Sequence, residues 1–242
     1  MSNRNFFYIS ITRKEQLLGW LYLIFEITLL PILLSAALMI LFPESNTTVL
    51  NLVLFAVNFI AVALIFRRYW LESFRGLSGR LWPILWRSAL ALIGCRLVLT
   101  VMNDLIYFYC PQYFIYTDIG PVLQNINDAN ITQMAKEQYL PVAIGTVLLV
   151  PPAEEILHRG VVFGSIYPKN PVMACIVSVL LFAFVHILSY LGIPDKVYLA
   201  ICFLQYIPPA LALCWLYTGT DSIFAPILMH MIFNAIGIFS VR

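Results

Sequence analysis

Long apolar runs recur along the whole chain, and they limit its fold more than any single motif does. Seven runs approach or exceed the roughly 20 mostly apolar residues that a helix needs to cross a bilayer. They cover residues 17–42, 49–66, 83–109, 139–167, 171–191, 196–217 and 221–240. Only 11% of the 242 residues are charged, whereas soluble domains carry about 25%. The sequence therefore predicts an all-α, polytopic bundle of about seven transmembrane helices.

Basic residues are unevenly shared among the connections, and this pattern predicts the orientation of the chain. The N-terminal segment, the second loop and the fourth loop are basic, and the loops between them are neutral or acidic. Because Lys and Arg are enriched in cytoplasmic loops, we expect a cytoplasmic N-terminus. The third run is interrupted by Arg87 and Arg96, and the basic, aromatic stretch before it suggests a short helix at the membrane surface.

We expect two parts that together form one bundle. Residues 1–138 hold the first three spans and a polar outer loop, and residues 139–242 hold the last four spans. The net charge of +2 is too small to indicate a nucleic-acid partner. The five cysteines form no C-x-x-C pair and are expected to be packing residues. The expected location is a multi-pass position in a membrane, most simply a bacterial plasma membrane.

Ionisable side chains gather in the last four spans, where they are costly and indicate function by default. They are Glu154, Glu155, His158, Arg159, His186 and His230, joined by the amide of Asn234. At a rise of about 1.5 Å per residue, Glu154, His186 and Asn234 lie roughly 20 Å from the cytoplasmic edge, and His230 roughly 14 Å. Three separate spans therefore place polar side chains in one slab of the membrane.

Helical spacing assigns different partners to the two adjacent glutamates. Glu155 and Arg159 are four residues apart, on one face, and can neutralise each other. Such a pair can be purely structural or part of a site, and the spacing alone leaves both possibilities open. His158 lies one turn from Glu154 on a face rotated by about 100°, and we expect it to be a structural residue.

Two prolines precede the glutamates and predict a break in the helix. Proline removes a backbone donor and kinks a helix interior, but it suits the first turn of a new helix. If a helix restarts at Pro152, then Glu154 and Glu155 lie in its first turn, where the helix dipole favours negative charge. The break would also line a hydrated pocket at that depth.

Three short motifs on these spans resemble those of a known family. EEILHRG matches E-E-x-x-x-R, FAFVH matches F-x-x-x-H, and HMIFN matches H-x-x-x-N, in that order within residues 139–240. The ordered trio resembles the CPBP family, the CAAX-protease and bacteriocin-processing (Abi) intramembrane endopeptidases. The resemblance implies hydrolysis of a peptide bond inside the membrane. The substrate would be a prenylated CAAX peptide, a peptide leader or another membrane-bound peptide.

The resemblance also implies a division of roles among the motif residues. The implied catalytic residues are Glu154, His186, His230 and Asn234, and the supporting pair is Glu155 and Arg159. Glu154 would be the general base that activates water, with help from His186. The other two catalytic residues would stabilise the oxyanion, and the supporting pair would brace the site.

Three alternatives accompany this interpretation. The first is a zinc site with Glu154, His186 and His230 as ligands. The chain has no H-E-x-x-H motif, and we prefer a metal-free glutamate mechanism without a cofactor to this zinc site. The second is a non-catalytic membrane scaffold or a bacteriocin self-immunity protein with the same fold. The third is a small transporter whose buried groups relay protons. The expected partners are lipid and a peptide or protein substrate, and the sequence does not indicate an oligomeric state.

Overall fold

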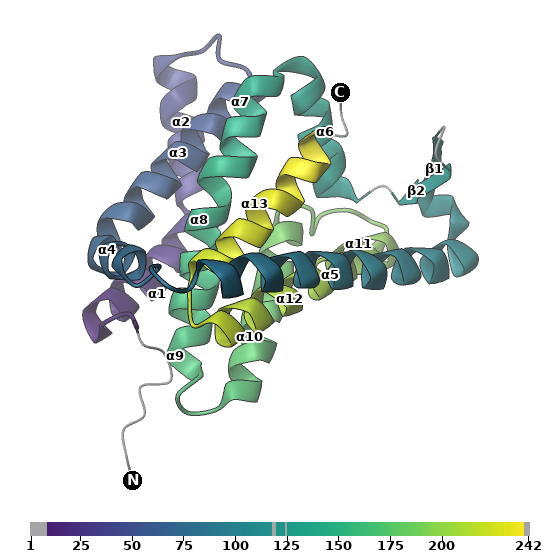
Figure 1. The fold of residues 1–242 in the computed structure, drawn as a ribbon. Helices are drawn as coiled ribbons and strands as arrows, with labels where there is room; N and C mark the ends of the chain where they lie inside the picture. The colour runs from purple at the N-terminus through teal and green to yellow at the C-terminus, as the bar shows by residue number, and fades with distance from the viewer. Residues whose placement is uncertain (1–8, 118–119, 124, 240–242) are drawn as a thin grey trace.

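The computed structural model describes residues 9–117, 120–123 and 125–239, and these form an almost entirely helical bundle (Figure 1). The N-terminal half contains α1 (Arg13–Thr28), α2 (Leu30–Leu41), α3 (Thr47–Ile65), α4 (Arg67–Arg75) and α5 (Leu81–Tyr109). The connection to the C-terminal half contains a 3₁₀ turn η1 (Pro111–Tyr113), strands β1 (Phe114–Thr117) and β2 (Gly120–Leu123), and α6 (Ile126–Glu137). The all-α class is confirmed, with this antiparallel hairpin as the one strand pair in the described residues.

The C-terminal half begins with a long helix that carries the two glutamates, and we name it the site helix. It runs from Tyr139 to Ile166 as α7 (Tyr139–Ala143), the π-helical η2 (Ile144–Leu149), α8 (Val150–Glu155), the π-helical η3 (Ile156–Phe163) and α9 (Gly164–Ile166). It is followed by α10 (Pro171–Leu188), α11 (Lys196–Gln205), α12 (Ile207–Thr220) and α13 (Phe224–Phe239).

The predicted number of seven spans is not confirmed. Five helices of the described residues are long and apolar enough to cross a membrane, and there are six if the bent pair α1 and α2 counts as one span. The seventh candidate, 221–240, is the 16-residue helix α13, which is only about 24 Å long. It starts late because Asp221 adopts a left-handed conformation that ends α12. The chain is nevertheless a multi-pass membrane protein by its long apolar helices.

A proline in the first apolar run and the length of the third explain why the runs do not all form upright spans. The first run is bent by 54° between α1 and α2, where Pro31 cannot donate to the preceding turn. Helix α5 has 29 residues, a length of about 43 Å, which exceeds the roughly 30 Å hydrocarbon core. Figure 1 shows α5 at a steep angle to α3 and the site helix. Composition predicted these helices, but it does not determine their direction.

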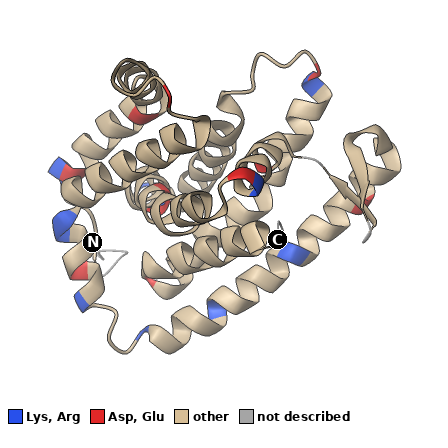
Figure 2. Ribbon diagram, turned by 90° about the horizontal axis from the view of Figure 1, so that it is seen from above, with Lys and Arg blue, Asp and Glu red and all other residues tan. Residues whose placement is uncertain are grey.

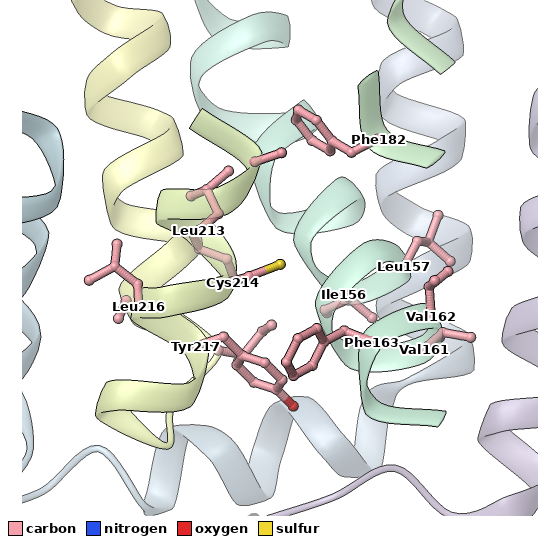
Figure 3. Close-up of a cluster of buried hydrophobic side chains, with 14 of the residues drawn as sticks. Ile156, Leu157, Val161, Val162, Phe163, Phe182, Leu213, Cys214, Leu216 and Tyr217 are labelled. Carbon is pink, nitrogen blue, oxygen red and sulfur yellow. The ribbon is translucent and has the colours of Figure 1, made fainter. Parts of the chain in front are cut away.

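The main core lies where the site helix packs against its neighbours. All eight residues of η3 are buried, and Figure 3 shows Ile156, Phe163 and their neighbours opposite Leu213 and Tyr217 of α12. The outer faces of α2, α3 and α5 expose Leu, Ile, Val and Phe instead, as expected for lipid-facing surfaces. Most charged residues lie towards the periphery of the bundle in Figure 2, and few lie inside it. The charged groups that do lie inside are therefore informative.

Candidate active site

The site helix does not break at its prolines, so the predicted restart at Pro152 is wrong. The chain stays helical from Tyr139 to Ile166, and the turn before the prolines widens instead. The Val150 amide donates to Gly145 O, five residues back, as in a π-helix. A π-segment of this kind takes up a local misfit without ending the helix. Because Glu155 ends α8, the glutamates do not lie in the first turn of a new helix, and the dipole argument does not apply to them.

The two adjacent glutamates have different environments. The side chain of Glu154 is 21% exposed, whereas that of Glu155 has no exposure. On a helix, neighbouring residues point about 100° apart, which explains how one can be enclosed while the other reaches an accessible space. Glu154 can therefore meet an external molecule, and Glu155 can act only on other side chains.

Glu154 lies between two histidines from other helices. Its Oε2 is 4.0 Å from His186 Nε2 on α10 and 3.9 Å from His230 Nε2 on α13. This oxygen is buried and has no hydrogen-bond partner among the described residues. Separations near 4 Å are too long for direct hydrogen bonds, and they suit an arrangement in which one oxygen atom bridges the groups. The structure thus brings these three predicted residues together.

Glu155 is the centre of a second, fully enclosed cluster. Its Oε1 accepts from Arg159 Nη1 at 3.1 Å and from His230 Nδ1 at 2.8 Å. The Arg159 side chain also has no exposure; its Nη2 donates to Ala210 O at 3.1 Å, and its guanidinium lies 4.5 Å from the centre of the Phe182 ring. A buried charge needs such partners, because an unpaired one is strongly destabilising. The predicted pair of Glu155 and Arg159 is present.

This cluster determines how His230 presents itself to Glu154. A carboxylate only accepts hydrogen bonds, so the contact with Glu155 assigns a proton to His230 Nδ1. The other nitrogen, Nε2, is then directed towards Glu154. An ionised group that fixes one imidazole nitrogen sets the chemistry of the other. Glu155 therefore links the enclosed cluster to the accessible one through a single ring.

His186 is held from three directions. Its Nδ1 lies 2.8 Å from Phe182 O, a carbonyl that can only accept, so this nitrogen carries the proton. The ring packs against Phe182, with ring centres 4.4 Å apart, and against Tyr206, with ring centres 4.2 Å apart. These contacts leave Nε2 as a proton acceptor directed at Glu154.

Asn234 and His158 are placed differently from the three convergent residues. Asn234 Nδ2 donates to Thr146 O on η2 at 2.8 Å, and no hydrogen bond in the described part of the chain joins it to Glu154 or to a histidine. His158 is buried, with its ring 5.2 Å from that of Phe182. Its Nδ1 has no hydrogen-bond partner among the described residues.

The donor set does not have the spacing of a zinc site. Tetrahedral Zn²⁺ with ligand bonds near 2.1 Å holds its donor atoms about 3.4 Å apart. The separations from Glu154 to the two imidazoles are wider, 4.0 and 3.9 Å. Within the described ranges, no group of three or more His, Cys, Asp and Glu side chains could hold a metal ion.

A polar group on the N-terminal helices was not anticipated from the sequence. Glu26 on α1 accepts from Asn58 Nδ2 on α3 at 3.2 Å, and Asn58 Oδ1 accepts from the Tyr22 hydroxyl at 3.0 Å. Glu26 also interacts electrostatically with Glu154. The signal was available, because an acid inside an apolar span indicates function by default. The first half of the chain therefore adds a further carboxyl group in the neighbourhood of Glu154.

Comparisons with known proteins agree with the motifs. Residues 136–236 match a family model described as type II CAAX prenyl endopeptidase Rce1-like. This segment contains the site helix, α10, α11, α12, and α13 as far as Ile236, and so includes Asn234. No match to the chain was found among curated proteins or among solved structures, and nothing in the comparisons supports bacteriocin immunity. Over residues 136–236, the chain is therefore similar to the Rce1-like family of type II CAAX prenyl endopeptidases.

Proposed function

We propose that this protein is an intramembrane endopeptidase that cleaves prenylated CAAX peptides with glutamate-activated water. One observation carries the proposal: Glu154, His186 and His230 converge from three helices to within 4.0 Å, around a carboxylate that is partly accessible. The family match supports prenylated CAAX peptides as the substrate class. A scaffold would not need an accessible carboxylate between two directed imidazoles.

The chemistry follows from the donor and acceptor atoms of the site. Glu154 Oε2 takes a proton from a water molecule, and the water oxygen attacks the carbonyl carbon of the peptide bond. His186 Nε2, an acceptor, helps to orient that water. The proton then passes from Glu154 to the amide nitrogen as the C–N bond breaks, which leaves a carboxylic acid and an amine and returns Glu154 to its ionised form.

The developing oxyanion is assigned to donors on α13. In its imidazolium form, His230 directs an Nε2–H into the site, while Glu155 and Arg159 hold its other nitrogen. Asn234 has two amide protons; one is bonded to Thr146, and the other is assigned to the oxyanion. Preorganised donors of this kind are among the largest contributions to catalysis.

The test uses purified protein in proteoliposomes and a farnesylated peptide that ends in a CAAX sequence. Mass spectrometry should identify cleavage by the wild type and a rate that is about 10²- to 10⁴-fold lower for Glu154→Gln, the range expected when a general base is lost. Glu137→Gln on the exposed face of α6 is the matched control, since it removes a carboxylate away from the site. Absence of cleavage by the wild type, or an unchanged rate in Glu154→Gln, would reject the proposal and favour a scaffold or a transporter.

A further inference from the structure

The catalytic histidine candidate on α10 is covered by a tyrosine that belongs to none of the three motifs. Tyr206 lies between α11 and α12, where Pro208 and Pro209 follow and interrupt the regular helix. Its ring centre is 4.2 Å from that of His186, with an angle of 32° between the planes. His186 also meets Phe182, with ring centres 4.4 Å apart. The imidazole therefore contacts two aromatic rings.

The tyrosine is itself fixed by the connection that precedes the family segment. Its hydroxyl lies 3.3 Å from Asn125 Oδ1 and 3.3 Å from Asp128 Oδ1, both acceptors. Asn125 caps α6, is buried, and donates to Gln205 Oε1 at 2.8 Å. The hydroxyl end is therefore tied to α6, and the ring face is left to pack on His186.

We infer that Tyr206 is a positioning residue for the proposed reaction: anchored by α6, its ring holds the His186 imidazole in the orientation that directs Nε2 at Glu154. The contact between His186 Nδ1 and Phe182 O fixes one point of the ring but leaves rotation about that point. The contacts with the Phe182 and Tyr206 rings restrict this rotation. This inference rests on the proposed function for its kinetic consequence, although the ring contact itself can be measured without activity.

The first test measures the accessibility of His186 and does not depend on catalysis. Carbethoxylation of histidines by diethyl pyrocarbonate, read by peptide mass spectrometry, should modify His186 between about 2- and 10-fold faster in Tyr206→Leu than in the wild type. This range corresponds to the loss of one aromatic contact. His230, whose ring packs against Phe182, is the reference within the same protein. Tyr113→Leu is the matched control, because the Tyr113 ring stacks on Tyr198 at 5.3 Å.

The second test asks whether the ring acts on the reaction. Tyr206→Leu should lower kcat about tenfold with little change in KM, and Tyr206→Phe, which keeps the ring, should restore kcat to within about threefold of the wild type. If Tyr206→Leu does not fold, Asp128→Ala on α6 replaces it, with a rise in His186 labelling of about twofold expected from a weakened anchor.

The outcomes separate the two proposals. Unchanged labelling of His186 in Tyr206→Leu, or in Asp128→Ala where that variant is used, overturns the positioning role whatever the activity is. Faster labelling together with an inactive wild type rejects the proposed function and retains the contact. A Tyr206→Phe variant as slow as Tyr206→Leu would show that retaining the ring does not keep His186 in position, which also overturns the inference.

Discussion

Replacement of Arg159 by methionine should destabilise the protein strongly, because it removes one charge of a fully enclosed pair. The guanidinium donates to Glu155 and to Ala210 O at 3.1 Å each and lies 4.5 Å from the Phe182 ring centre. Loss of one partner of a buried pair costs about 3–5 kcal/mol. In a chain of about 240 residues, 1 kcal/mol shifts Tm by about 2–4 °C. Arg159→Met should therefore lower Tm by about 10 °C, as measured by tryptophan fluorescence in detergent micelles.

A double variant separates the charge from the loss of packing. Glu155→Gln removes the negative charge and keeps an oxygen that can accept from His230 Nδ1. Arg159→Met combined with Glu155→Gln should therefore recover at least half of the lost Tm. Arg67→Ala, on the exposed side of α4, is the control and should change the free energy of unfolding by about 0.5 kcal/mol or less. If Arg159→Met shifts Tm by less than about 2 °C, the enclosed pair does not support the site.

Three further predictions address packing, pH and metal. Gly19→Ala on α1 should lower the free energy of unfolding by about 1–3 kcal/mol, because its new Cβ would lie 2.5 Å from Val161 Cγ2. The control Gly94→Ala, with nothing within 4 Å of its new Cβ, should be neutral or stabilising. Equal effects of the two changes in chemical unfolding would contradict the close contact of α1 with η3. Hydrogen bonds from the Tyr198 backbone amide and the Tyr113 hydroxyl lower the pKa of Asp195, in the loop before α11, below 3.8. The ionised Asp195 should therefore stabilise the folded protein above pH 4, and this stabilisation should be lost as the pH falls through the lowered pKa. Asp195→Asn should then narrow the gap in Tm between pH 6 and pH 3, and an unchanged gap would count against this assignment. Treatment with a chelator should leave the cleavage rate unchanged; stoichiometric zinc in the purified protein, with activity lost on its removal, would instead establish the zinc alternative.

The sequence predicted the helices well because burial in lipid depends mainly on composition. Six of the seven apolar runs correspond to long helices or to the bent pair of α1 and α2. Direction and length were not predictable in this way. The angle of α5 depends on packing against α12 and α13, and the short length of α13 depends on the left-handed conformation of Asp221. The first arises from contacts between segments far apart in the chain, and the second from the backbone conformation of one residue.

The sequence also predicted which polar groups would meet, but it did not predict how the backbone allows this. A depth of roughly 20 Å for Glu154 and His186 agrees with their separation of 4.0 Å in the structure. The prediction that the helix restarts at Pro152 was wrong, because a π-helical turn can compensate for a missing backbone donor without ending the helix. Tyr206 was not identified, since an aromatic residue in a span is by default a packing residue, and its contact with His186 requires α6 to anchor it.

The central claim is that Glu154 and His186 act on one water molecule as a unit, and the most direct measurement is the effect of His186→Ala in two backgrounds. Residues that act as a unit are strongly non-additive. In the wild type, His186→Ala should lower the single-turnover cleavage rate by about 10²-fold. In Glu154→Gln, where no base remains to be assisted, the same change should lower it by less than about threefold. An equal loss in both backgrounds would mean that the two residues act independently, and it would contradict the proposed mechanism.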